Sequence, residues 1–549
     1  MDGYSSPSLL WQGFDPAAAV TDVSVIRDEV TEGVRTYAFY FTALKSGDAV
    51  VRAYVCARYR IADIQRKGTK LPAVLVLSAG GVPPVLPKGV AEITLDILGA
   101  REGKDRFTLY PPAFDYANPA LGLSGDALFT VTGSPKETPW YVWTAMTRRA
   151  ATLILALPFV DTARLGLYGA GLSCVVGWNV LGTDNRFRCA VLVDPAGHEG
   201  ESIFRIGAAA DASESATLFR SCFGVTGHLP QTQCPVLFHM GTNTPTGMFD
   251  RISQAVGRAT DTPIFFSVTP RGERALGTEQ KQNLLLWWEG QLKGAADFPA
   301  LPTLVVRRED GKRIASLSAA PGPVLPSALK LFYAVAGAAP ACRNWTDLGA
   351  GDGPSLSAAV PLFVTGQYAF VLGVATYPDG LTIAAPEVAF LTDADDTVLP
   401  MPRSRMLYDA RTVGTGCTYP LPGEDPTQSA PQTESRLGLS GVAVQGAGLS
   451  TYIFGDPRVA PPNGEAELCF SCYTETDQPL TIAMTEYIDG IPGQNYTKIL
   501  ALSGLRVWQR VVVAYADFKN DGRALPGWQN VKKMTLSARN VLVSTLLWV

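Results

Sequence analysis

The first 300 residues alternate between apolar runs typical of buried strands and longer segments with helical periodicity. Residues 21–60 read as short β-type runs. The run LPAVLVLSAGG at 71–81 is continuously apolar and ends in glycines, which is typical of a buried parallel strand that leads into a loop. Further strands are expected at 165–169, 189–197, 234–243 and 263–270, and helices at 138–157, 171–182 and 278–294. Strands that alternate with helices predict an α/β fold, a doubly wound parallel sheet, over residues 1–298 with an N-terminal β extension.

The pattern changes after residue 298, where short alternating strands with Pro and Gly turns replace the helices. Residues 299–397 contain no convincing helix and predict a small β-sandwich. Residues 398–435 include the Pro-rich stretch TYPLPGEDPTQSAPQTES and predict a linker or long loop. Residues 436–549 again read as strands throughout and predict a second all-β domain, a jelly-roll-like sandwich. A chain of 549 residues is long enough for several such domains.

Composition fits a folded protein with sizeable cores, since 47% of the residues are apolar and 17% are charged. The net charge of −4 and the lack of a basic cluster predict no nucleic-acid partner. No apolar stretch is long enough for a membrane span, so no membrane association is expected. The first residues have neither the basic start nor the apolar run of a signal peptide. We therefore expect a cytoplasmic protein, or an extracellular one if the start has been trimmed.

The cysteines predict buried thiols and no bound metal. Nine cysteines, an odd number, are scattered over the whole chain, which fits reduced thiols better than a disulfide framework. Cys469 and Cys472 form a C-x-x-C pair, but the pair lies inside a strand-like run and no second pair accompanies it. We expect no metal and no cofactor.

The most informative stretch is LGLYGAGLSC at 165–174, where a strand leads through a glycine-rich turn into a helix. It resembles the nucleophile elbow of serine hydrolases, G-x-S-x-G, in which the serine stands at the tip of a strained turn. The first glycine of that pattern is Gly169, and the nucleophile position is Gly171. Because glycine has no side chain, it cannot attack a carbonyl.

From about residue 20 to 295 the chain resembles α/β-hydrolases of the dienelactone hydrolase and acetyl xylan esterase kind. The resemblance lies in PAVLVLSAGG, WYVWTAMTRRAATLILALPFVDTARLGLYGAG, CAVLVDPAG and CPVLFHMGTN. Residues 300–395 resemble the β-sandwich appended to some of these bacterial proteins. Residues 436–549 are similar to the galactose-binding-like jelly rolls of carbohydrate-binding modules, through LCFSCYTETDQPL, WQRVVVAYADF, GWQNVKKMTLS and VLVSTLLWV.

The resemblance implies a nucleophile, an acid, a base and an oxyanion loop, and this chain departs from the pattern at each. The loop that would form the oxyanion hole keeps Gly80 and Gly81 but has no histidine. The position after the strand at 234–243 where the family has its acidic residue, called the acid slot, holds Asn243 and Thr244. The loop expected to carry the base reads RGERALGTEQ, without histidine, and the whole chain has only three histidines. The resemblance therefore implies a degenerate catalytic site.

An atypical nucleophile is the alternative. Ser173 and Cys174 follow the turn at the start of a helix, where backbone N–H groups favour developing negative charge. Asp194 and His198 follow a predicted strand and could supply an acid and a base, although capping by Asp194 and a surface position for His198 are simpler explanations. We favour a packing role for Ser173. We also predict that His239, inside a strand run, is a core residue.

Sugar binding would need exposed aromatic rings in the C-terminal region. Trp508, Trp528 and Trp548 lie in strand-like runs and are expected in the core. The residues nearest to expected loops, and therefore the candidate sugar contacts, are Tyr487, Tyr496 and Trp528.

The sequence thus predicts a non-catalytic, carbohydrate-esterase-like protein that binds a glycan or glycoconjugate, or scaffolds a partner. One alternative is an active serine-type carboxylic ester hydrolase that uses Ser173 or Cys174. A second is a structural, self-associating protein, in which homo-oligomers form.

Overall fold

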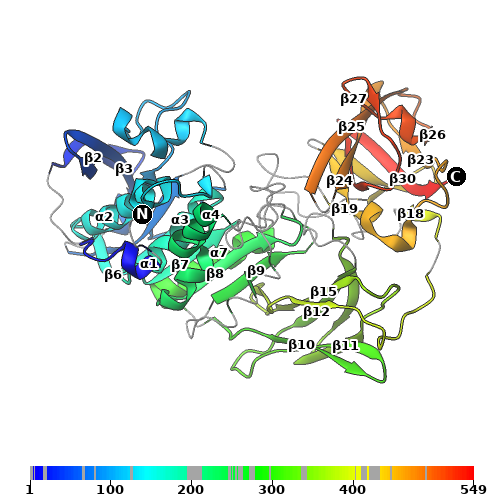
Figure 1. The fold of residues 1–549 in the computed structure, drawn as a ribbon, viewed down its shortest axis with the longest axis horizontal. Coiled ribbons are helices and arrows are strands. Elements are labelled where there is room, and N and C mark those ends of the chain that lie inside the picture. The colour runs from blue at the N-terminus through cyan, green and yellow to red at the C-terminus, as the bar shows by residue number, and fades with distance from the viewer. Residues whose placement is uncertain are drawn as a thin grey trace. The chain divides into compact units, whose positions relative to one another are not determined.

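The computed structural model describes residues 4, 6–16, 22–64, 68–78, 82–123, 128–194, 213–244, 249, 252–253, 256, 264–270, 272, 278–295, 298–335, 343–401, 404–409, 417–418, 433–445, 448–488 and 491–549. The chain divides into two compact units (Figure 1). The first consists of Met1–His239, Thr246–Ser267 and Lys281–Pro299, and the second of Met240–Pro245, Val268–Gln280 and Ala300–Val549.

The first unit is built on a mixed sheet with the strand order β1-β2-β3-β5-β4-β6-β7-β8-β9. Strands β5, β4, β6, β7 and β8 run parallel, whereas β1, β2 and β3 form an antiparallel extension that joins the sheet through β3 and β5. The strand bounds are β1 Ser24–Thr31, β2 Val34–Ser46, β3 Ala49–Arg60, β4 Leu71–Ser78, β5 Ala91–Asp96, β6 Val160–Ala170, β7 Cys189–Val193, β8 Val236–Gly241 and β9 Ile264–Thr269. The parallel sheet with an N-terminal β extension is the arrangement that the alternating pattern predicts.

Helices cover both faces of this sheet. Two glycines, one in β6 and one in α3, show which helix packs on which face. A Cβ on Gly166 would lie 2.7 Å from the Trp288 ring of α7, and a Cβ on Gly177 of α3 would lie 2.5 Å from the Leu192 side chain. That Cβ would also approach Leu167, which faces the opposite side of β6 from Gly166. Helices α3 and α7 therefore pack on opposite faces. The helix bounds are α1 Pro7–Leu10, α2 Pro139–Leu155, α3 Leu172–Leu181, α4 Glu214–Phe223, α5 Val225–His228 and α7 Thr278–Lys293.

Helix α2 shows how local sequence sets an element in place. Thr138 accepts a hydrogen bond from the Tyr141 amide at the helix start, and Pro139 occupies the first turn, where its missing N–H costs nothing. The helix buries Trp140 and Trp143 completely. No described helix of the chain is long and apolar enough to cross a membrane.

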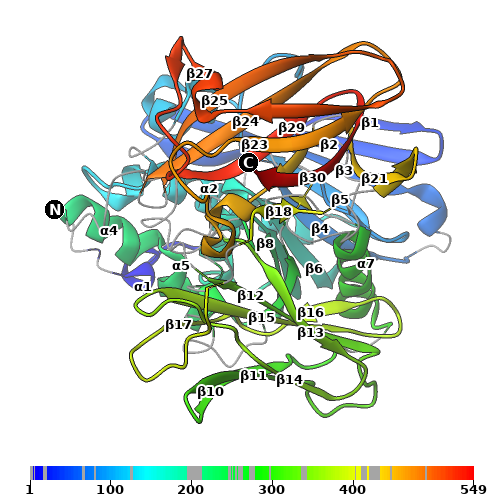
Figure 2. The same ribbon diagram turned by 90° about the vertical axis from the view of Figure 1, so that its right-hand side faces the viewer.

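Residues 303–391 of the second unit form two sets of antiparallel strands (Figure 2). Gly373 of β15 lies against Leu317 of β11, where a Cβ would come within 2.6 Å of the leucine side chain, so the two sets pack face to face. One set is β10 Thr303–Glu309, β11 Lys312–Ser318 and β14 Ser355–Ala359; the other is β12 Ala328–Val335, β13 Thr346–Gly351, β15 Tyr368–Thr376, β16 Thr382–Ala384 and β17 Val388–Leu391. That residues 299–397 form a separate small β-sandwich domain stays a prediction.

The C-terminal part of the second unit contains two further antiparallel sheets with one shared core. Their orders are β20-β21-β30-β23-β26, with β18 beside β30, and β19-β22-β29-β24-β25-β27-β28. The bounds are β18 Met406–Tyr408, β19 Cys417–Thr418, β20 Thr433–Arg436, β21 Leu439–Gln445, β22 Leu449–Thr451, β23 Leu468–Tyr473, β24 Gln478–Ile488, β25 Ile491–Leu502, β26 Trp508–Val513, β27 Lys519–Asn520, β28 Arg523–Ala524, β29 Val531–Ser537 and β30 Asn540–Trp548. Whether this part is a jelly roll of galactose-binding type stays a prediction.

The linker expected at 398–435 needs correction. Strand β18 pairs with β30, and its Leu407 and Tyr408 are buried in the shared core. Strand β19 pairs with β22. Strands of two or three residues carry too little periodicity to be distinguished from a loop, which is why the pattern missed them. The Pro-rich residues 419–432 lie outside the described part of the chain.

The three candidate sugar contacts are buried, and of these Trp528, which was also expected in the core, lies outside a strand. Tyr487 lies in β24 and Tyr496 in β25, not in loops, and both side chains are buried. Trp528 is buried in the shared core, donates a hydrogen bond to the Ala466 carbonyl at 2.7 Å, and contacts the Trp548 ring. A buried ring offers no open face to a sugar, so none of the three is suited to stacking on a ligand in this structure.

Candidate functional site

The turn between β6 and α3 holds Gly171, the residue at which the sequence analysis places the nucleophile position. Strand β6 ends at Ala170, α3 begins at Leu172, and Gly171 between them has φ 61° and ψ −125°. This conformation is strained for any residue with a side chain, and such strain is typical of the elbow tip. A Cβ built on Gly171 would meet no atom within 4 Å. The position therefore has room for a side chain and has none.

The residues on either side of the tip are fixed by close packing. A Cβ on Gly169 would lie 2.5 Å from the Ser173 carbonyl oxygen, so the strand and helix can approach this closely only because Gly169 has no side chain. The Gly171 N–H donates to the Val193 carbonyl at 2.9 Å, and the Gly171 carbonyl accepts from the Cys174 N–H at 3.0 Å. These bonds hold the tip between β7 and the first turn of α3.

Ser173 and Cys174, the two alternative nucleophiles, have no exposed side chain. The Ser173 hydroxyl accepts a hydrogen bond from the Ala170 N–H at 2.9 Å and donates one to the Ala170 carbonyl at 2.8 Å, and the side chain is fully buried. Cys174 is fully buried as well. Ser173 therefore joins the last residue of the strand to the helix, as a packing role requires.

Asp194 follows the last residue of β7, beside the elbow. It is 6% exposed, has φ 49°, and its N–H donates to the His239 carbonyl at 2.9 Å. A left-handed backbone at a non-glycine residue is a strained feature that often accompanies functional sites. Burial raises the pKa of the nearby Tyr168 hydroxyl well above its usual value, and the charges of Asp194 and Cys174 add to that effect.

The acid slot after β8 is filled by groups with structural partners. The Asn243 side-chain amide donates to the Arg343 carbonyl at 2.7 Å, and its carbonyl oxygen accepts from the Thr242 hydroxyl at 3.0 Å. Thr244 is fully buried, and its N–H donates to the Gly241 carbonyl at 3.3 Å. Arg343 itself forms a fully buried ion pair with Glu387 at 2.9 Å, which local sequence patterns gave no reason to expect.

Two of the three histidines are enclosed in the core. The His239 Nδ1 lies 3.2 Å from the Ser267 hydroxyl, which also accepts a hydrogen bond from the Asn283 amide at 2.7 Å. The His228 Nε2 lies 3.2 Å from the Cys222 carbonyl. Burial lowers the pKa of His239 to about 3 and that of His228 to about 4, so both are neutral near pH 7. His198, Gly80 and Gly81 lie outside the described residues.

We expect these buried histidines to make the fold sensitive to acid. Each has a folded-state pKa below its unfolded value of about 6.5, so the unfolded chain binds protons first as the pH falls. Stability is complete above pH 6.5 and is lost towards pH 4, by about 2 kcal/mol for each histidine between pH 6.5 and 5. Urea unfolding at several pH values measures this slope. His228→Gln and His239→Gln should each flatten it; slopes equal to that of the wild type would contradict the assignment.

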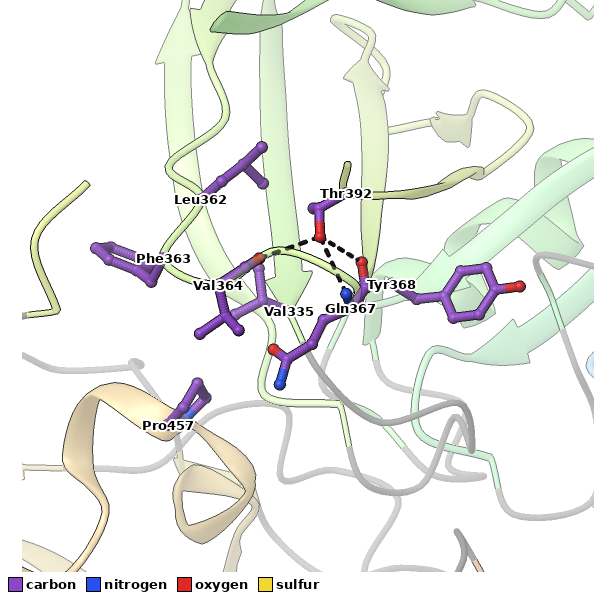
Figure 3. A pocket seen from close by; sticks show the side chains of 8 residues that line it. All are labelled: Val335, Leu362, Phe363, Val364, Gln367, Tyr368, Thr392 and Pro457. Atoms are coloured by element: carbon purple, nitrogen blue, oxygen red, sulfur yellow. Dashed lines mark hydrogen bonds between the residues drawn. The ribbon is translucent and has the colours of Figure 1, made fainter. Parts of the chain in front are cut away.

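The described residues offer no metal site, and a hollow found among them is small for a ligand. No group of three or more His, Cys, Asp or Glu side chains in this part of the chain is placed to hold a metal ion. A hollow in the second unit is lined by eight residues and encloses about 230 Å³, including open solvent, which is below the usual size of a ligand pocket. Figure 3 shows that the Thr392 hydroxyl there forms hydrogen bonds with backbone groups of Val364 and Gln367.

Comparison with known proteins gives structural neighbours only. No protein-family model and no curated protein sequence matches the chain. Among solved structures, an acetyl xylan esterase from Paenibacillus sp. R4 superposes with a TM-score of 0.40 at 14% identity, covering 52% of this chain and 94% of that one. A glucuronoyl esterase from Solibacter usitatus gives 0.35 at 12% identity, covering 50% and 86%. An S-formylglutathione hydrolase from Agrobacterium tumefaciens gives 0.33 at 13%, covering 49% and 99%. At this level of similarity the function has to be judged from the site itself.

Proposed function

We propose that this chain is a non-catalytic, esterase-like protein that uses a hydrolase scaffold to hold a partner. The observation that carries the proposal is Gly171, which occupies the elbow tip in the strained conformation of a nucleophile but has no side chain. The amide of Leu172 follows it at the start of α3, where an oxyanion donor would lie. The backbone of an elbow is thus present while the attacking group is missing.

The alternative of an active esterase has less support. Ser173 uses its hydroxyl in two backbone hydrogen bonds, and both Ser173 and Cys174 are fully buried, so a substrate carbonyl has no access to either side chain. A nucleophile also needs a base within hydrogen-bond reach. His228 and His239 are enclosed among other side chains, and the segment after β9 has no histidine in its sequence.

A scaffold is favoured over a glycan-binding protein because the aromatic residues proposed to contact sugar are buried. Tyr487, Tyr496 and Trp528 each expose less than a tenth of their surface. Sugar recognition by stacking needs an open aromatic face. A protein partner needs only an exposed surface of suitable shape and polarity.

The expected result of an esterase assay is no turnover above the buffer rate. p-Nitrophenyl acetate, acetylated xylo-oligosaccharides and a glucuronoyl ester should each be tested with the full-length chain. Ser173→Ala and Cys174→Ala are the matched variants, with thermal melts to show that each is folded. A trace contaminant would leave the same rate in all three proteins. Turnover that one folded variant abolishes would contradict the proposal and would identify the nucleophile.

A further inference from the structure

Two neighbouring turns of the C-terminal sheets expose an unusual amount of apolar surface. The hairpin between β20 and β21 presents Leu437, which is 72% exposed, and the segment before β26 presents Leu505, which is 70% exposed. Leu439 and Val507 beside them are exposed as well. Together with Trp508, these residues are called the turn patch. Exposed apolar residues that gather in this way indicate an interaction site more often than isolated ones do.

Trp508 joins the two turns. Its indole N–H donates to the Arg436 carbonyl at 2.8 Å, at the end of β20. A Cβ on Gly441 would lie 2.7 Å from the Trp508 ring, so the ring rests on β21 where a glycine makes room for it. Trp508 is only partly buried and lies apart from the shared core that contains Trp528 and Trp548. The prediction that Trp508 is a core residue is therefore wrong.

The segment before β26, which carries Leu505, is held in place before any partner arrives. The Gly504 N–H donates to the Asp477 carboxylate at 2.6 Å, the Gln509 amide donates to the Ser503 carbonyl at 2.6 Å, and the Arg506 N–H donates to the Thr474 carbonyl at 3.3 Å. Groups that are already ordered lose less conformational entropy on binding.

Leu437 has a backbone conformation that is energetically unfavourable for leucine. It has φ 51° and is followed by Gly438 with φ 79°, so two residues with positive φ connect the hairpin. Asparagine or glycine is the usual choice at the first of these positions, and leucine is strained there. An exposed leucine in a strained turn contributes nothing evident to the fold of the chain, which points to a role in binding.

Charges of both signs border the turn patch, without an excess of cations. Arg436 pairs with Glu434 at 2.8 Å and lies 3.9 Å from Glu475, which also lies 3.9 Å from Arg506. With Asp477, which accepts from the Gly504 N–H, two cations and three anions leave no excess of positive charge, whereas a nucleic acid or an anionic membrane would require an excess of cations. A surface with an apolar centre and both signs at its edge is complementary to itself, as a two-fold interface requires.

We propose that the turn patch is a homodimer interface, with a second copy of this chain as its occupant. Leu437 and Leu505 of each copy pack against the same patch of the other. Arg506, which is 71% exposed and only loosely paired within its own chain, contacts Glu475 of the other copy. This interface is independent of whether the chain is catalytic.

Sedimentation velocity on the full-length chain, over concentrations up to about 100 µM, tests the proposal. We expect a reversible monomer–dimer equilibrium, which the Leu437→Asn, Leu505→Ser double variant weakens at least about tenfold. Asparagine suits the left-handed turn better than leucine, so Leu437→Asn should not lower the melting temperature. The matched control is Ile499→Thr, which removes an equally exposed aliphatic group from β25 and should leave the equilibrium unchanged.

A charge exchange tests the pairing of residues. Arg506→Glu and Glu475→Arg should each weaken the dimer, because each places like charges opposite one another. An equimolar mixture of the two variants should dimerise again, since both contacts then join opposite charges. A chain that stays monomeric, a dimer that is indifferent to Leu437→Asn with Leu505→Ser, or a mixture that does not recover would each overturn the proposal.

Discussion

Gly171→Ser is expected to give a folded protein without esterase activity, whereas Gly169→Ala is expected to disrupt the elbow. A Cβ at 171 meets no atom within 4 Å, so the main cost of the substitution is backbone strain, about 1–3 kcal/mol. A Cβ at 169 lies 2.5 Å from a backbone oxygen, which cannot turn away as a flexible side chain could. We expect Gly169→Ala to lower the free energy of unfolding by about 3 kcal/mol or more. Urea unfolding of the two variants measures the difference.

Activity is not expected to return with the serine, because the members of a triad act as a unit. The serine would have no positioned base, since His228 and His239 are buried among other side chains. Gly171→Ala is the matched control, because it introduces the same backbone strain without a hydroxyl. A rate more than about a thousandfold above the uncatalysed rate in Gly171→Ser alone would show that a base, such as His198, is already in place.

The turn from β6 through Gly171 into α3 could be predicted because its residues form a local sequence pattern. A buried strand, two glycines separated by one residue and an apolar helix start occupy ten consecutive positions, 165–174. The close approach at Gly169 demands glycine, and the positive φ at Gly171 favours it. The core position of His239 could be predicted for a similar reason, because the residues around it in β8 are apolar and the strand is fully buried.

The features that the sequence analysis missed depend on residues far apart in the chain. The Arg343–Glu387 pair joins two segments separated by 44 positions, and neither residue is marked by its neighbours. Tyr487 and Tyr496 lie near expected turns, but β24 and β25 continue past those points, so the tyrosines became strand residues. Trp508 has the same apolar neighbours as a core tryptophan. Only its place at the sheet edge, over Gly441, gives it an exposed surface.

The stability of the C-terminal domain is expected to depend on residues before 436. A fragment 404–549 is expected to melt cooperatively, whereas 436–549 is expected to be much less stable. The shorter fragment lacks β18, whose Leu407 and Tyr408 are each only 4% exposed in the shared core. It also lacks the Arg405 carbonyl that accepts from the Trp548 N–H at 2.7 Å, so one edge of β30 becomes open.

The size of this effect follows from the side chains that leave the core. Removing a buried leucine costs about 2–5 kcal/mol, and the loss of Tyr408 adds to that cost. The total stability of a domain is only about 5–15 kcal/mol, so the shorter fragment should be largely unfolded or melt far earlier. Thermal melts followed by circular dichroism compare the two fragments, with Leu407→Ala in 404–549 as the intermediate case. Equal melting temperatures would show that β18, β19 and residues 433–435 of β20, all absent from the shorter fragment, are dispensable, and would restore 398–435 as a linker.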